Sequence, residues 1–469
     1  MTFNSFAYAL FLPVVLVFHW LLPRRLRLPL LLAASYVFYA AWDWRFLGLL
    51  VVSTLTDFGV GMTLEKTRAE RPRRMLLCLS VLVNLGILGT FKYFDFFAAE
   101  FSRLLGTFGL DAHPPTLDLV LPVGISFYTF QTLAYSIDVY RRKIPACRDP
   151  LLFATYVAFF PQLVAGPIER AGHLIPQLAD RTRRPDFTRA VSAMGLILRG
   201  LFRKVVIADQ MAPIVEAVFE GGTPPRMLSS LTALVAFSLQ IYGDFAGYTD
   251  IARGSARLFG VELVENFWQP YLATGVTDFW RRWHVSLSTW LRDYLYIPLG
   301  GNRRGPTRTY TNLMATMLLG GLWHGASSTF LVWGGLHGLG LVAERASTGR
   351  LSRAAASGRL RRIASLALTF AFVTCAWSFF RGDSIGEATR VLAGLVTPGL
   401  GGVDGDQLAL LAAASAATFG LDLAERRIVD PLSFLTRRPI LAGALAGSTL
   451  LAILVAGATP PTRFIYFQF

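Results

Sequence analysis

The chain contains six histidines, few enough to weigh one by one as sites of proton transfer. Imidazole is the side chain that most readily gains and loses a proton near neutral pH. His324 lies in the glycine-rich run GGLWHGA, His284 in FWRRWHVSLS, and His337 in GGLHG. The other three stand where a membrane interface or a loop explains them: His19, His113 and His173. His324 is the first candidate for a general base, because a glycine-rich break in an apolar segment opens space around a polar ring.

Other polar groups could take part in chemistry, and each also has an ordinary explanation. His284 precedes a segment rich in Trp, Arg and Tyr that equally suits anchoring at a membrane interface. The turn at residues 300–305, GGNRRG, could hold a phosphate-bearing ligand but matches no phosphate-loop motif. Asp244, Asp250 and Glu169 could relay protons or simply pair with nearby arginines. The sequence shows neither a metal-ligand cluster nor a GxSxG nucleophile elbow.

The composition predicts a membrane protein. Of 469 residues, 53% are hydrophobic and 16% charged, and the mean hydropathy is +0.47. A soluble core could not bury that much apolar surface, so a soluble enzyme is excluded. The net charge of +15 lies in short clusters between apolar runs, which is typical of loops on the cytoplasmic side of a membrane and argues against nucleic acid as a partner. The three cysteines are scattered and show no disulfide or CxxC spacing.

Alternation of basic loops predicts the topology. Basic loops follow the apolar runs 6–22 and 46–62, so both belong in the cytoplasm and the N-terminus lies outside. The run 151–166 breaks this alternation and contains prolines, which predicts a re-entrant or broken helix buried in protein. We expect about ten or eleven membrane-spanning helices with additional re-entrant or interfacial helices, an all-α fold, and one domain over residues 1–469.

The segment that positions His324 is the apolar stretch 312–344. As one helix it would reach about 50 Å, too long for one span, and both of its flanks are basic. We therefore expect a hairpin that breaks near Gly320, Gly321 and Gly325, with His324 at the break. His284 falls on the cytoplasmic side. Residue chemistry alone fits a membrane-embedded transferase or hydrolase and a proton-coupled transporter equally well.

Five long motifs and a short terminal one resemble a known family. They are LPVGISFYTFQTLAYSIDVYRR (121–142), FFPQLVAGPIERA (159–171), DFAGYTDIARGSARLFG (244–260), DFWRRWHVSLSTWLRDYLYIPLGGNR (278–303), LWHGASSTFLVWGGLHG (322–338) and FIYFQF (464–469). Together they resemble the membrane-bound O-acyltransferases, in particular the bacterial branch that acetylates alginate and other exopolysaccharides. The resemblance is strongest over residues 121–344.

The resemblance implies roles for individual residues. His324 matches the family's membrane histidine and would act as general base on the acceptor hydroxyl, and His284 would assist at the donor side. On that side Arg282, Asn302 and Arg303 would contact the donor. The resemblance also implies funnels from both membrane faces that nearly meet in a tunnel between donor and acceptor, and Trp323, Trp283 and Tyr294 are expected to line it. The implied donor is a cytoplasmic acyl thioester, acetyl-CoA first, used as a substrate with no bound cofactor or metal.

The resemblance also implies partners and a location. The acceptor would be a hydroxyl on the extracytoplasmic side, on a polysaccharide, with a separate extracytoplasmic acetyltransferase completing the transfer. The chain would lie in the bacterial inner membrane. Two alternatives stay open: transfer of D-alanine from a carrier protein to teichoic acid, and a proton-coupled transporter or flippase. The lack of an internal repeat weighs against the transporter.

Overall fold

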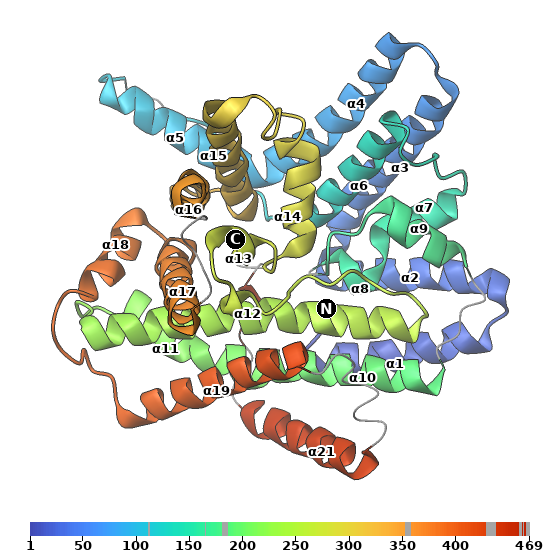
Figure 1. The fold of residues 1–469 in the computed structure, drawn as a ribbon. Coiled ribbons are helices and arrows are strands. Elements are labelled where there is room, and N and C mark those ends of the chain that lie inside the picture. Colours follow the sequence, from blue (N-terminus) through green and yellow to red (C-terminus); the bar gives the residue numbers. More distant parts are fainter. Residues whose placement is uncertain are drawn as a thin grey trace. The chain divides into compact units, whose positions relative to one another are not determined.

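The computed structural model describes residues 1–110, 113–164, 166–180, 186–351, 358–427, 438–458, 462, 464 and 465, and every regular element among them is helical (Figure 1). The first elements are α1 (Phe6–Leu21), α2 (Arg24–Asp43), η1 (Trp44–Phe46), α3 (Leu47–Lys66), α4 (Glu70–Leu88), η2 (Gly89–Tyr93), α5 (Phe94–Thr107), α6 (Ile125–Tyr140), α7 (Pro150–Ala158), α8 (Phe160–Leu163) and α9 (Ala171–Ala179). The next are α10 (Phe187–Leu201), η3 (Phe202–Ala208), α11 (Asp209–Phe219), α12 (Met227–Leu258), η4 (Pro270–Leu272), α13 (Val276–Trp280), α14 (Val285–Leu291) and η5 (Arg292–Tyr296). The last are α15 (Gly305–His324), α16 (Ser328–Leu351), α17 (Arg359–Arg381), α18 (Ile385–Gly394), α19 (Gly405–Arg427) and α21 (Pro439–Ala456).

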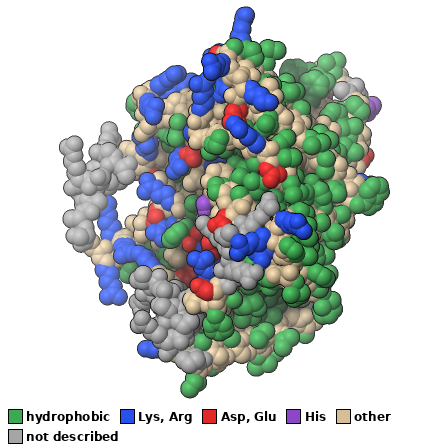
Figure 2. Space-filling model, turned by 90° about the vertical axis from the view of Figure 1, so that its right-hand side faces the viewer, with side chains coloured by type: hydrophobic (Ala, Val, Ile, Leu, Met, Phe, Trp, Pro, Cys, Tyr) green, Lys and Arg blue, Asp and Glu red, His purple; other side chains and the backbone are tan. Residues whose placement is uncertain are grey.

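The helices carry the apolar surface of a membrane protein. Among the described residues, four helical stretches are long and apolar enough to cross a bilayer: Arg24–Lys66, Glu70–Thr107, Arg359–Arg381 and Gly405–Arg426. Phe6–Leu21 and Ile440–Ala456 are shorter apolar helices. Large hydrophobic side chains are exposed in broad areas, with groups of Lys and Arg elsewhere on the same face (Figure 2). The predicted all-α, polytopic membrane class is confirmed, while the count of ten or eleven spans stays a prediction.

The described residues form two compact units. One unit contains Met1–Ala193 and Ala252–Val264, and the other contains Met194–Ile251 and Glu265–Phe469. The chain passes between them within α10, within α12 and after Val264. One domain over residues 1–469 stays a prediction.

In the first unit, α3, α4 and α6 pack together, and α7 packs on α2. The predicted break in the run 151–166 is confirmed, because α7 ends at Ala158 and α8 begins at Phe160. Phe159 between them is fully buried, so the interrupted backbone lies inside protein. The helix that follows the loop after α5 is α6, which starts only at Ile125. Gly124 before it has a φ of +77°, and Pro122 cannot donate a helical hydrogen bond.

In the second unit, α15 and α16 form the predicted hairpin. The break lies at Gly325, which is in extended conformation between the two helices. Gly320 and Gly321 are inside α15, so the break occurs at only the last of the three predicted glycines. Gly321 serves packing instead: a Cβ added there would lie 3.2 Å from the Cα of Gly334 and would also collide with the carbonyl oxygen of Phe330. The two glycines therefore let α15 and α16 touch backbone to backbone.

Candidate active site

His324 is the last residue of α15 and lies directly before the hairpin break, as predicted. Its side chain is buried. Three aromatic rings pack against the imidazole, with centroids 5.0 Å away for Trp323, 5.0 Å for Trp333 and 5.2 Å for Phe380. In such water-poor surroundings, electrostatic interactions between the ring and a bound group are stronger than in water.

The break itself requires the glycine that follows the histidine. A Cβ at position 325 would collide with the ring of Phe330. That ring packs edge-on against Phe380 at 4.9 Å, and Phe380 contacts His324 in turn. Gly325 thus allows the rings of Phe330 and Phe380 to pack against the end of α15.

His284 is fully buried and precedes the first residue of α14. Its φ of +43° is uncommon for a residue with a side chain, and such strained positions cluster at functional sites. The Nδ1 atom lies 3.1 Å from Oδ1 of Asn266, and the ring of Phe245 packs edge-on at 4.6 Å. Burial lowers the pKa of His284 to about 3, so its imidazole is neutral at physiological pH.

The structure brings the two predicted histidines to one tryptophan. The buried ring of Trp323 lies 5.9 Å from the ring of His284 and 5.0 Å from that of His324. The three side chains come from α15 and from the segment before α14, which are separated by some forty residues in the sequence. This juxtaposition is the geometric basis of the candidate site.

His337 packs against one of the aromatic rings that surround His324. It lies one turn after Trp333 on α16, with ring centroids 4.8 Å apart, and it is fully buried. The Trp280 indole nitrogen donates a hydrogen bond of 3.3 Å to its Nδ1. Because an indole N–H can only donate, Nδ1 of His337 is the acceptor and its proton is on Nε2.

The remaining predicted site residues have mixed placements. Trp283 is buried in the same aromatic cluster, 5.6 Å from Phe279 and 5.0 Å from Trp377. Tyr294 packs against Trp290 at 5.1 Å. Arg282 pairs with Asp278 at 2.7 Å. Asn302 and Arg303 are exposed on the turn between η5 and α15. The donor-binding and tunnel-lining roles of these residues stay predictions.

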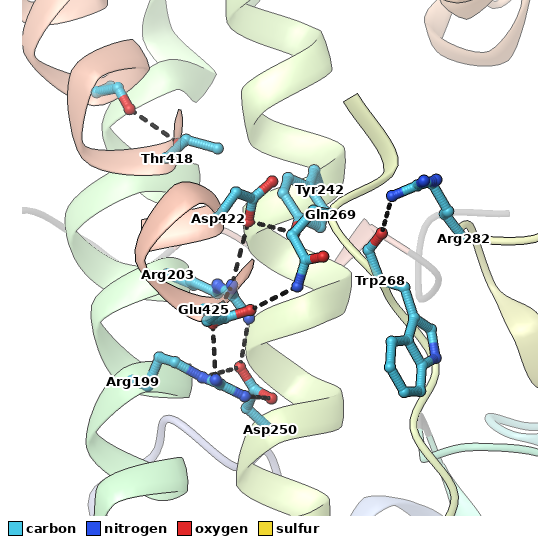
Figure 3. A network of polar contacts seen from close by, with 11 residues as sticks. Arg199, Arg203, Tyr242, Asp250, Trp268, Gln269, Arg282, Thr418, Asp422 and Glu425 are labelled. Carbon is cyan, nitrogen blue, oxygen red and sulfur yellow. Dashed lines mark hydrogen bonds and ion pairs between the residues drawn. The ribbon is translucent and has the colours of Figure 1, made fainter. Parts of the chain in front are cut away.

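A network of charges lies in the second unit, with Arg203 and Asp250 buried and Arg199 and Glu425 half-buried (Figure 3). Arg199 and Arg203 are four residues apart and reach carboxylates of two other helices. Asp250 of α12 accepts ion pairs of 2.5 and 2.6 Å, and Glu425 of α19 accepts ion pairs of 2.7 and 2.9 Å. Oε2 of Glu425 also accepts a hydrogen bond of 3.3 Å from Gln269, on the loop that carries Asn266.

The suggested pairing of the carboxylates with nearby arginines is confirmed for one of the three, Asp250, because Asp244 and Glu169 pair with other basic side chains. Asp250 pairs with the two arginines above, and Asp244 pairs with Lys204 at 2.8 Å. Glu169, in the other unit, instead binds His173 at 2.7 Å and raises the pKa of that imidazole.

Sequence analysis did not identify Asn266, Trp333 or Phe380 as parts of the site. Trp333 had a usable signal, because it lies one helical turn before His337 in the motif that also contains His324. Asn266 and Phe380 lie in no such motif. Their contacts with the histidines depend on how separate segments pack together.

Comparison with known proteins points to one family. Residues 148–381 match the family model described as MBOAT, membrane-bound O-acyltransferase family, and this range includes His284, His324 and His337. The chain is 42% identical over 402 residues to the probable alginate O-acetylase AlgI of Azotobacter vinelandii, covering 85% of this chain and 79% of that protein.

Two further relatives differ in their named substrates. The peptidoglycan O-acetyltransferase of Helicobacter pylori is 37% identical, over 84% of this chain and 79% of that protein. The teichoic acid D-alanyltransferase of Bacillus subtilis is 25% identical, over 58% of this chain and 71% of that protein.

Proposed function

The chain belongs to the membrane-bound O-acyltransferase family, and we propose that it moves an acetyl group from cytoplasmic acetyl-CoA to a hydroxyl group on the extracytoplasmic side. The acyltransferase activity follows from the family. The acetyl group and a polysaccharide acceptor are supported by relatives named for the O-acetylation of alginate and peptidoglycan. The observation that carries the proposal is the buried His324 at the helix break, beside the Trp323 ring that also contacts His284.

In the proposed reaction, His324 takes the proton of the acceptor hydroxyl as the hydroxyl oxygen attacks the thioester carbonyl. The tetrahedral intermediate collapses, the C–S bond breaks, and the leaving sulfur receives the proton from His324. The products are an acetyl ester and a free thiol, so the reaction balances without another reactant. The buried surroundings of His324 support this role, because they limit access of water that would hydrolyse the thioester.

We assign the remaining residues to binding. Arg282, Asn302 and Arg303 would contact the phosphate groups of the donor, and Trp323, Trp283 and Tyr294 would shape the tunnel between donor and acceptor. The basic loops support a location in the bacterial inner membrane with the N-terminus outside. A separate extracytoplasmic acetyltransferase would then pass the acetyl group of this ester to the sugar.

The test uses inverted membrane vesicles and acetyl-CoA labelled in the acetyl group. Label is expected in base-labile adducts with wild-type protein and is lost with His324→Ala at equal expression. His113→Ala is the matched control, because His113 is exposed and its substitution leaves the candidate site unchanged. Equal labelling by wild type and His324→Ala would show that His324 is not the base. No labelling by wild type would exclude acetyl-CoA as the donor.

One relative supports a second candidate, transfer of D-alanine. The similarity to the teichoic acid D-alanyltransferase of Bacillus subtilis is lower, at 25% identity, and covers 58% of this chain. Supplying the vesicles with carrier-bound D-alanine in place of acetyl-CoA separates the two. We expect acetyl transfer only.

A further inference from the structure

The loop between α12 and η4 carries Asn266, a fully buried residue whose side-chain oxygen accepts three hydrogen bonds. Oδ1 lies 3.1 Å from the backbone nitrogen of Ser286, 3.0 Å from the Ser286 hydroxyl and 3.1 Å from Nδ1 of His284. The backbone carbonyl of Asn266 also accepts the N–H of Val285 at 2.9 Å. Asn266 therefore holds the residues on both sides of the peptide that joins His284 to α14.

These contacts determine which way the amide points. A backbone N–H can only donate, so the Asn266 atom facing the nitrogen of Ser286 must be the oxygen and not the NH₂ group. The assignment follows from the main chain and does not depend on the protonation state of His284.

The orientation of the amide in turn determines the tautomer of the histidine. An amide oxygen can only accept, so Nδ1 of His284 must carry the proton that points to Asn266. In a neutral imidazole the other nitrogen, Nε2, is then the acceptor. His337 is the opposite case, because Trp280 donates to its Nδ1 and the proton lies on Nε2.

We propose that Asn266 is a positioning residue that fixes His284 in the Nδ1–H tautomer, so that His284 meets a substrate only as a hydrogen-bond acceptor at Nε2. The inference rests on the proposed function for the involvement of His284. It adds that His284 does not polarise the thioester carbonyl, since Nε2 has no proton to donate. It serves instead a group that donates, such as an amide N–H of the donor's arm or the released thiol.

The strained backbone of His284 explains why several bonds are needed. A φ of +43° is sparsely populated for histidine, and the chain adopts it only where its surroundings enforce it. Two backbone hydrogen bonds pin this stretch to the Asn266 loop: Val285 N–H to Asn266, and Trp268 N–H to the carbonyl of Arg282, both 2.9 Å.

Three substitutions test the proposal. Asn266→Leu removes the acceptor, Asn266→Asp keeps an oxygen for all three bonds, and Ser286→Ala removes one donor while leaving the acceptor in place. We expect Asn266→Leu to lower kcat for acetyl transfer on the order of 10²-fold with little change in KM, as for other residues that orient a working imidazole. Asn266→Asp should restore at least a tenth of the wild-type kcat, and Ser286→Ala should stay within about threefold of wild type.

The tautomer is read directly from ¹⁵N spectra of purified protein labelled at histidine nitrogen, with His284→Gln to assign the signals. Wild type, Asn266→Asp and Ser286→Ala should show Nδ1–H at His284, and Asn266→Leu should show a mixture of tautomers. A proton on Nε2 of His284 in the wild type would overturn the proposal, as would a wild-type kcat for Asn266→Leu. The spectra need no turnover, so absence of acetyl transfer by wild type would count against the proposed function and leave this result interpretable.

Discussion

Two of the buried polar clusters in the described part of this chain differ in what surrounds their polar groups, and this difference bears on which of them takes part in the proposed reaction. In the first unit, Asp57 on α3 accepts hydrogen bonds from Ser80 and Asn84 of α4 and from Ser136 of α6, the last two of 2.7 and 2.6 Å. In the second unit, His284 and His324 lie against the faces and edges of aromatic rings. Both clusters are buried, but the Asp57 cluster comes from three helices, whereas the histidines come from the end of α15 and from the segment before α14.

The Asp57 cluster is held together by hydrogen bonds between its own side chains. Asn84 donates to Asp57 and to the carbonyl of Ser80, and its own oxygen accepts from Ser53 and Thr132 at 2.7 and 3.2 Å. Each of these groups binds another within the cluster, which joins three helices. A polar residue inside a membrane segment is a functional candidate by default. The Asp57 cluster shows that such residues can instead hold helices together. It is the structural case with which the histidine site is compared.

The sharpest test of the comparison is His324→Gln. Glutamine has a similar length and polarity but takes up no proton, so we expect kcat for acyl transfer to fall by about 10²–10⁴-fold. The unfolding midpoint in detergent, followed by tryptophan fluorescence, should change little. A large loss of stability with normal activity per folded molecule would place His324 in the scaffold.

The charged network in the second unit could stabilise the fold, support the histidine site, or do both. The substitution Arg203→Met separates these roles. Arg203 is buried and pairs with Asp250 and Glu425, so its loss leaves buried carboxylate charge less compensated. We expect a loss of about 3–5 kcal/mol in unfolding free energy. Because Glu425 also binds Gln269 of the Asn266 loop, kcat should fall severalfold as well.

Lys66→Met is the control for Arg203→Met, since it removes an exposed positive charge at the end of α3. Both the unfolding free energy and kcat should be close to wild type. If Arg203→Met lowers stability alone, the network is scaffold only.

Sequence reasoning was most successful where the information is local. The run GGLWHGA predicts a break, and the break places His324 at a helix end. A side chain at position 325 would collide with a nearby ring, and a side chain at position 321 would collide with the backbone of another helix. Both positions therefore require glycine, but the sequence does not show that the reasons differ. The hydrogen bond that His284 donates to Asn266 depends on the packing of a loop and on a strained backbone, which no sequence periodicity indicates.

The residues of the Asp57 cluster follow a regular spacing in the sequence. Its residues come as three pairs spaced by four, which places each pair on one face of a helix. The pairs are Ser53 with Asp57, Ser80 with Asn84, and Thr132 with Ser136. Three such pairs on apolar helices indicate that their polar side chains form hydrogen bonds with one another where the helices pack together.

Asp57→Asn tests the scaffold side of the comparison. The side chain keeps its size but presents one NH₂ group to a site where hydroxyls and the Asn84 amide donate. At least one buried donor then faces another, so we expect a loss of about 1–3 kcal/mol in unfolding free energy. Activity per folded molecule should be unchanged. A midpoint equal to wild type would mean that the hydroxyls reorient and the cluster tolerates a donor at this position.

Ser53→Ala should have the smallest effect, because the Asn84 oxygen that accepts the Ser53 hydrogen bond keeps a second donor. The oxygen of Asn84 still receives the Thr132 hydroxyl at 3.2 Å, so only the net value of one hydrogen bond is lost, about 0.5–1.5 kcal/mol. Thermal unfolding of Ser53→Ala, Asp57→Asn and the double variant should give less than the sum of the single losses if the groups act as one cluster. Full additivity would mean that the bonds are independent, and the contrast with the histidine site would then rest on its aromatic surroundings alone.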